Sequence, residues 1–113
     1  MAIKFGTDGW RALIAEDYTF DNVRLCSQAV CEYMKARQIN DNGLIIGYDT
    51  RFGSDRFATA AAEVAAANGI PVVLCDRFSP TPVVSHNLVN RECGAGIVIT
   101  ASHNPGEWNG FKF

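Results

Sequence analysis

The sequence predicts a three-layer α/β/α domain around a mainly parallel mixed sheet of about four strands, the last of them antiparallel. Amphipathic segments with helical periodicity alternate along the chain with short, uniformly apolar segments. Such apolar segments suit parallel strands that are covered on both faces, and this alternation is typical of domains with right-handed crossovers. The 113 residues suffice for one domain with a core, and no repeat or internal boundary divides them.

The first predicted helix covers residues 19–38. Thr19 is the expected N-cap, because its side-chain oxygen can accept a hydrogen bond from the first turn, and Asp21 suits the positive end of the helix dipole. Apolar residues then recur at three- and four-residue spacing, which defines an amphipathic helix. Its inner face is expected to hold Val23, Cys26, Val30, Tyr33 and Met34.

A strand and a second helix are expected next. Residues 43–49 (GLIIGYD) form a short apolar run opened by an Asn-Gly pair, which predicts a buried parallel strand. Ser54 is the predicted cap of the second helix, and Asn68-Gly69 supplies the left-handed exit that helix ends favour. The predicted inner face of this helix includes Phe57, Ala61, Val64 and Ala65.

The last third of the chain continues the same alternation. Residues 71–75 (PVVLC) and 95–100 (AGIVIT) predict two more strands, and residues 110–113 (GFKF) predict a short edge strand that turns back. Between them, a Thr-Pro pair combines an N-cap with proline at the first helical position, so a third helix is expected over residues 81–91. Its inward residues should be Val84, Leu88 and Val89.

Composition and charge exclude several classes of function. Ten Lys and Arg residues against twelve Asp and Glu give a net charge of −2, which creates no field that would gather nucleic acid or a membrane surface. No apolar run approaches the roughly 20 residues that a membrane span needs, and no signal peptide is recognisable, so a cytoplasmic protein is expected. The four cysteines lack metal-ligand spacing and are expected to be buried thiols: Cys26, Cys31, Cys75 and Cys93.

Two polar loops are expected at one edge of the sheet, because ligands of open α/β sheets collect outside the carboxyl ends of the strands. They are DTR (residues 49–51) and TASHNP (residues 100–105). Asn104 precedes a proline, which stiffens the second loop and favours an exposed Ser102. Ser102 and His103 need not form a triad pair, since adjacent residues of an extended segment point to opposite sides, and the G-x-S-x-G motif of hydrolases is absent. The residues alone leave open a nucleophilic serine or a polar turn with a capping serine.

Two further segments carry groups that suit a phosphate. FGTDGWR (residues 5–11) is expected to be a tight loop in which backbone N–H groups, Thr7 and Arg11 could meet an anion. The alternative is a structural turn on which Trp10 packs. Lys112 follows TASHNP and could reach back to the same loop, although a single lysine is more often solvated surface.

Taken in order, FGTDGWR, GYDTR and TASHNPGEWNGFKF resemble the first domain of the α-D-phosphohexomutases, the phosphoglucomutase and phosphomannomutase superfamily. The resemblance covers nearly the whole chain, and TASHNP followed by NGFKF at this separation is specific to that family. It implies that residues 1–113 are a single domain, the first of a larger multidomain enzyme. It also implies the reaction, in which Ser102 donates a phosphoryl group to a hexose phosphate and takes back the other phosphate of the bisphosphate formed, so that phosphate moves between O1 and O6.

The resemblance assigns roles to individual residues. The expected catalytic residues, with His103 as the proton-transfer partner, are Ser102, His103, Lys112 and Arg11. The expected substrate-binding residues are these four together with Thr7 and Asn104.

Asp49 and Arg51 are expected to support this site. A carboxylate facing a doubly charged phosphoserine would be unfavourable, so Asp49 is expected to orient Arg51 instead. The resemblance further implies a bound Mg²⁺ that the phosphate on Ser102 helps to hold, with hexose 1,6-bisphosphate as activator and intermediate. The other metal ligands of the family lie in a D-x-D-x-x-R loop of its second domain, and no D-x-D occurs in these 113 residues.

The isolated chain is therefore expected to bind Mg²⁺ poorly and to be inactive. Its expected partners are the remaining domains of the enzyme and a phosphosugar, and Trp10 favours glucose or mannose phosphates. The alternative is a non-catalytic single-domain α/β module that docks on a partner or binds an anion.

Overall fold

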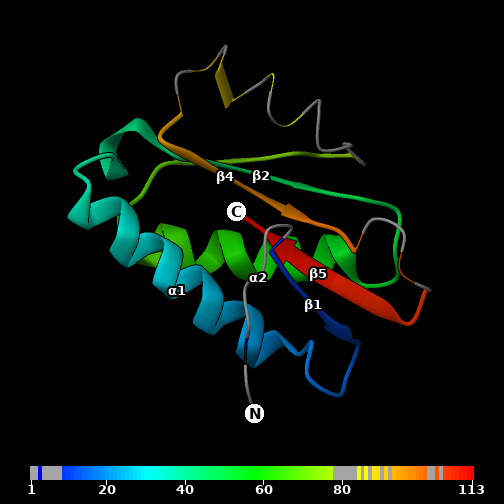
Figure 1. Ribbon diagram of the computed structural model, residues 1–113. Helices are drawn as coiled ribbons and strands as arrows, with labels where there is room; N and C mark the ends of the chain where they lie inside the picture. Colours follow the sequence, from blue (N-terminus) through cyan, green and yellow to red (C-terminus); the bar gives the residue numbers. More distant parts are fainter. Residues whose placement is uncertain are drawn as a thin grey trace.

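The chain folds around a five-stranded mixed sheet (Figure 1). The computed structural model describes Ile3 and residues 9–77, 84, 86, 88, 89, 91, 93–101, 104 and 106–113. Within these residues the elements are β1 (Trp10–Leu13), α1 (Phe20–Ala36), a 3-10 turn (Asn40–Asn42), β2 (Leu44–Tyr48), α2 (Ser54–Ala67), β3 (Val72–Leu74), β4 (Ala95–Ile99) and β5 (Trp108–Lys112).

The sheet has the strand order β1-β5-β4-β2-β3. β2 pairs in parallel with both β3 and β4, and β5 pairs antiparallel with β4 and β1. The predicted mixed sheet and its antiparallel last strand are confirmed. The predicted edge position of that strand is wrong, because β1 pairs with its outer side and makes a fifth strand. Trp10–Leu13 therefore forms a strand and not part of a tight loop.

Helix α1 begins as the sequence predicts. The hydroxyl of Thr19 accepts a hydrogen bond from the backbone N–H of Asn22 at 3.2 Å. Four of the five predicted inward residues are buried, but Tyr33 is 43% exposed. Its ring lies against Phe113 edge-on and under the guanidinium of Arg37, 5.2 Å from the ring centroid, so the ring is covered by neighbours at the surface instead of by the core.

Helix α2 begins one residue earlier than predicted. Its N-cap is Gly53, which has a left-handed φ of 77°, and Ser54 is the first helical residue. The predicted cap at Ser54 is wrong because its hydroxyl donates to Asp49 and makes no capping bond. The predicted exit is confirmed, since Gly69 has a φ of 75°. The buried face of this helix includes Phe57, Ala61 and Ala65, and Val64 is partly buried.

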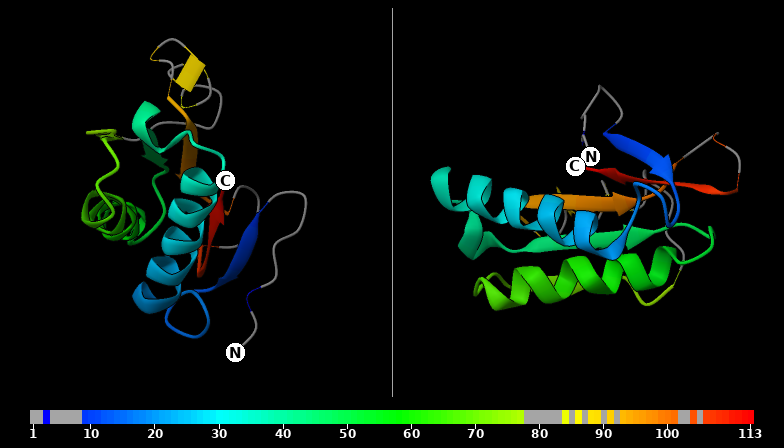
Figure 2. Two further views of the ribbon diagram at one scale, coloured as in Figure 1. Left: turned by 90° about the vertical axis from the view of Figure 1, so that its left-hand side faces the viewer. Right: turned by 90° about the horizontal axis from the view of Figure 1, so that it is seen from below.

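Apolar residues cover both faces of the sheet, as expected of three layers. The larger cluster lies under α1 and α2, and it includes Trp10 stacked on Tyr18 with ring centroids 4.8 Å apart. On the other face Val84 packs with Ile45 and Val98. The described residues among 84–89 are helical, and they lie across the sheet from α1 and α2 (Figures 1 and 2). Val89 is 71% exposed, so its predicted inward position is wrong.

The described part of the chain contains no helix long and apolar enough to cross a membrane. None of the four cysteines forms a disulfide. Cys26 and Cys31 are buried as predicted, whereas Cys75 and Cys93 are only partly buried. Burial raises the pKa of the Cys26 thiol to about 11 and also raises that of Cys31. These two thiols are packing residues, not reactive ones.

Candidate functional site

The carboxyl ends of β2 and β4 lie side by side, and this is where the two predicted loops meet. The backbone N–H of Asp49 donates to the carbonyl of Ile99 at 3.2 Å. From β2 the chain goes on to β3 at one edge of the sheet, whereas β4 leads to β5 on the other side. A strand order that reverses in this way marks the place where open α/β sheets bind ligands.

Asp49 is the centre of a polar cluster at this place. Its carboxylate accepts hydrogen bonds from the hydroxyl of Thr100 at 2.6 Å and the hydroxyl of Ser54 at 2.9 Å. It also accepts the backbone N–H of Arg51 at 3.0 Å, and the Arg51 Nε lies 3.4 Å from its second oxygen. The ion pair required for Asp49 to orient Arg51 is therefore present, and both carboxylate oxygens are engaged by protein donors.

Arg51 holds the backbone of the β4–β5 loop. Its side chain is 12% exposed. One terminal nitrogen donates to the carbonyl of Asn104 at 2.7 Å, and the other donates to the carbonyl of Trp108 at 3.2 Å. Because the two carbonyls belong to the middle and the end of the loop, the fork geometry of the guanidinium fixes their relative position.

Arg11 contacts the same loop from β1, the strand that pairs with the outer side of β5. Its guanidinium donates to the side-chain oxygen of Asn104 at 3.0 Å. In the register of β1 and β5, Arg11 lies opposite Gly110. A Cβ at position 110 would lie 3.0 Å from the Arg11 Cγ and would collide with the carbonyl of Thr100. Glycine at this position therefore lets the Arg11 side chain lie across β5.

Lys112 shares one face of the sheet with Arg11. It is two residues from Gly110 along β5, and its pairing partner on β4 is Val98, which belongs to the apolar cluster on the face opposite α1 and α2. Because side chains alternate along a strand, residues 110 and 112 point to the same face. The structure thus brings Arg11 into contact with Asn104 and places Lys112 on the same face of the sheet as Arg11.

The predicted residues Ser102, His103 and Thr7 lie outside the described residues. The neighbours of the serine and histidine are described: Ala101 is buried, and its carbonyl accepts the backbone N–H of Asn104 at 3.0 Å. This turn and the two arginine contacts fix Asn104 relative to the carboxyl end of β4.

Sequence reasoning missed three polar residues of this cluster. Thr100 and Ser54 both donate to Asp49, and the side-chain amide of Asn109 donates to the Ser54 hydroxyl at 2.9 Å. Ser54 and Asn109 are fully buried. The available signal was a polar residue at the edge of each predicted element, but the capping rule already explained Ser54, and Asn109 lies just before the predicted strand 110–113.

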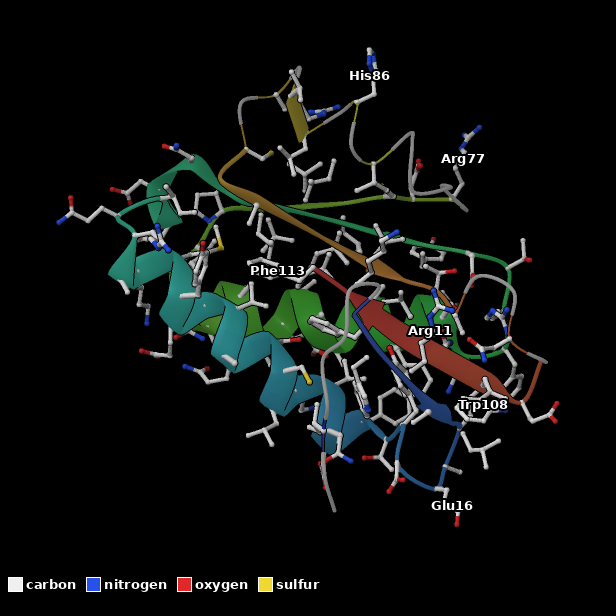
Figure 3. The ribbon with its side chains drawn as sticks, in the orientation of Figure 1. Arg11, Glu16, Arg77, His86, Trp108 and Phe113 are labelled. Atoms are coloured by element: carbon white, nitrogen blue, oxygen red, sulfur yellow. The ribbon has the colours of Figure 1, made fainter. Side chains whose placement is uncertain are left out.

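Two cavities near these elements do not suit a phosphate. One of about 190 Å³ lies beside Arg11 and Trp108, but Glu16 and Asp17 also line it and would repel an anion (Figure 3). A larger one of about 720 Å³ lies between the starts of α1 and α2, where Phe20, Phe52 and Phe57 line it. Among the described residues no three His, Cys, Asp or Glu side chains gather as metal ligands.

The fold is a layered α/β domain, and its polar residues collect at the carboxyl ends of two neighbouring parallel strands. Two arginine side chains contact the loop that follows one of these strands. The family model described as phosphoglucomutase/phosphomannomutase, alpha/beta/alpha domain I, matches residues 2–113. The chain belongs to this family.

Individual relatives agree. The chain is 35% identical to a phosphoglucomutase of Staphylococcus saprophyticus and 35% identical to a human phosphopentomutase, in each case over 97% of this chain and 20% of the relative. A crystal structure from Thermus thermophilus, of a protein assigned as a phosphomannomutase, superposes with a TM-score of 0.91 at 36% identity, over 98% of this chain and 25% of that one. The chain thus spans about a fifth of the length of the curated relatives it matches.

Proposed function

We propose that this chain is the phosphoserine domain of a phosphohexomutase, which interconverts hexose 1-phosphate and hexose 6-phosphate through a bound 1,6-bisphosphate. The observation that carries the proposal is the convergence of Arg11 and Arg51 on Asn104, two residues after Ser102, in a member of this family. Phosphoryl transfer needs positioning and charge neutralisation more than covalent chemistry, because negative charge stays on the phosphoryl oxygens throughout.

The proposed roles of Ser102, His103 and Thr7 come from the family resemblance, and those of the two cations are supported by their positions in the sheet. Ser102 forms the O–P bond as the donor oxygen of the substrate phosphate leaves, and it loses the phosphoryl group again when a sugar hydroxyl attacks. His103 exchanges the hydroxyl proton during these steps. Arg11 and Lys112, which share one face of the sheet, bracket the transferring phosphate, and Thr7 contributes to binding.

Asn104 has two proposed tasks. It faces the substrate from the loop, as the family resemblance implies, and its side-chain oxygen holds the Arg11 guanidinium at 3.0 Å. Arg51 and Asp49 support the loop from behind, since the guanidinium of Arg51 is directed at the carbonyls of Asn104 and Trp108.

A magnesium ion fits this site only through Ser102. Both carboxylate oxygens of Asp49 are already bonded to protein donors, so Asp49 is unsuited as a ligand. The phosphate on Ser102 would supply one oxygen, and the family's D-x-D-x-x-R loop in another domain would supply the carboxylates. When bound, the ion neutralises charge on the transferring phosphate.

The proposal also concerns the rest of the protein, its location in the cell and its substrates. The relatives are about five times as long as this chain, which supports further domains of the same enzyme as its partners. The isolated chain is proposed to be inactive, and the enzyme is proposed to work in the cytoplasm on glucose or mannose phosphates. The name of the human relative makes pentose phosphates the first alternative substrates to test.

The test is a mutase assay on the complete protein encoded by the source gene, with glucose, mannose and ribose phosphates in separate reactions. Ser102→Ala should abolish turnover, whereas Ser85→Ala, a control serine outside the motif, should not. Arg11→Ala and Lys112→Ala should each lower kcat/KM about a hundredfold or more, because each removes a charge from the transferring phosphate. Intact mass should show a phosphate increment that Ser102→Ala removes.

Three outcomes would overturn the proposal. They are full turnover by Ser102→Ala, no turnover of any phosphosugar by the complete wild-type protein, or unchanged kcat/KM in both cation variants. Turnover by the 113-residue chain alone, well above background, would overturn the proposed inactivity of the isolated domain. Phosphate binding without turnover would favour the anion-binding module.

A further inference from the structure

We propose that Thr100 is a positioning residue for the loop that carries Ser102, and that it acts through a partly buried side-chain bridge of Thr100, Asp49, Ser54 and Asn109. The inference rests on the proposed function of Ser102. It adds a device for holding the nucleophile that neither the motif nor the family match assigns.

The bridge joins the two stems of the loop. Thr100 directly follows β4 and begins the loop, whereas Asn109 is the second residue of β5, after the loop has ended. The Thr100 hydroxyl donates to Asp49 at 2.6 Å, the Ser54 hydroxyl donates to the other oxygen of Asp49 at 2.9 Å, and the Asn109 amide donates to Ser54 at 2.9 Å. Three consecutive hydrogen bonds therefore connect the start of the loop to its end.

The backbone at both stems is bonded as well. The N–H of Thr100 donates to the carbonyl of Gly110 at 3.0 Å, and the N–H of Gly110 donates to the Asn109 side-chain oxygen at 2.8 Å. Thr100 is thus fixed by its backbone and by its side chain at once. The backbone bond to Gly110 and the side-chain bond to Asp49 together determine the direction in which the chain leaves β4.

Burial explains why this cluster is suited to positioning. Ser54 and Asn109 are fully buried, and buried polar groups add little net stability unless every partner is in place. Apolar residues would fill the same space with comparable stability, but they could slide against one another. Hydrogen bonds are directional, so a satisfied buried network permits one geometry of the loop stems.

The first experiment compares variants of the complete enzyme. Thr100→Val removes the hydroxyl with nearly the same shape, and it should lower kcat about tenfold to a hundredfold while KM changes less than about twofold, because the substrate contacts remain and the nucleophile is displaced. Thr100→Ser keeps the hydroxyl and should restore most of the loss. The matched control is Thr59→Val, which removes an exposed threonine hydroxyl from α2 and should leave both constants unchanged.

The second experiment needs no enzymatic activity. Hydrogen exchange of the Asn104 amide, which is bonded to the Ala101 carbonyl, reports the turn inside the loop. In the 113-residue chain, Thr100→Val should speed this exchange about tenfold or more, whereas the amide of Ile97 in β4 should exchange as in the wild type. Ser54→Ala, which cuts the bridge at another bond, should act in the same direction and decides the question if Thr100→Val does not fold.

The outcomes separate this inference from the proposed function. Unchanged kcat and unchanged Asn104 exchange in Thr100→Val would overturn the inference while leaving the mutase proposal standing. An equal loss in Thr100→Val and Thr59→Val, or a loss that Thr100→Ser does not restore, would also overturn it. Absence of turnover in the wild-type enzyme would defeat the mutase proposal, and the exchange measurement would still show whether Thr100 orders the loop.

Discussion

Two regions of the molecule use the same strands in different ways. Under α1 and α2, β4 and β5 contribute Ile99 and Phe111 to a large apolar cluster. One residue nearer to the β4–β5 loop on each strand, Thr100 and Gly110 belong to the polar site. In the apolar region the side chains make many packing contacts, and such contacts are not directional. In the polar region the side chains make few contacts, but these are hydrogen bonds between fixed donors and acceptors. Stability should therefore depend mainly on the first region and loop geometry mainly on the second.

The largest expected effect is on stability alone. Phe111→Ala empties a fully buried position in the apolar cluster and should lower the free energy of unfolding by about 3–5 kcal/mol. Urea unfolding of the purified chain would measure this loss. Phe113→Ala, at a position that is 52% exposed, is the control and should cost far less. Equal losses would contradict the assignment of the core to the α1 and α2 face.

Gly110→Ala should affect both regions, because position 110 lies between them. The added methyl group would collide with the Thr100 carbonyl and crowd Arg11, so β5 must shift. We expect a loss of about 1–3 kcal/mol in urea unfolding, together with faster exchange of the Asn104 amide. Gly106→Ala is the matched control, since a Cβ there meets no atom within 4 Å. A loss of stability without faster exchange would show that the two regions are less closely coupled than the register suggests.

Tyr18→Phe should have a smaller effect that links the two regions. The buried Tyr18 hydroxyl donates to the Gly110 carbonyl at 2.7 Å, and the same carbonyl accepts the Thr100 N–H. Removal of one neutral donor leaves the carbonyl bonded, so a loss of about 1 kcal/mol is expected. Thermal unfolding would measure it, and a loss above that of Phe111→Ala would reverse the proposed ranking.

The smallest expected effect concerns pH and the apolar region only. Burial raises the pKa of Cys26 from 9.0 to about 11, so the unfolded chain loses this proton at lower pH than the folded chain. Stability is therefore complete below about pH 9 and falls as the pH rises towards 11. Urea midpoints at about pH 8 and pH 10 should differ less in Cys26→Ala than in the wild type. An equal pH dependence would assign the effect to other groups.

Most of the fold could be predicted from the sequence because periodicity and end signals act locally. Thr19 caps α1, the uniformly apolar residues of β2 are all buried, and Gly69 ends α2 with a positive φ. β1 could not be predicted in the same way. Residues 10–13 become a strand only because β5 pairs with them, and that partner lies about a hundred positions away in the sequence.

The sequence pointed to the charged residues of the cluster and to Asn104, but not to its other neutral residues. Motif order pointed to Arg11, Asp49 and Arg51, and the structure brings all three to the loop. Ser54 and Asn109 were not found, because a serine at a helix start and an asparagine before glycine both have ordinary local explanations. Their bond joins the start of α2 to β5 across 55 positions of the chain, and no local pattern contains it.

The pairing of β1 with β5 has a consequence for synthesis of the protein. Arg11 and Asn104 are separated by 93 positions, so a nascent chain that emerges from the ribosome carries its first strand without a partner until nearly all of this domain has been made. Arg11 can take up its position only after β5 and the loop that precedes it have been synthesised. Assembly of this polar edge is thus a late event in the synthesis of these 113 residues, and the apolar layers under the helices can form before it.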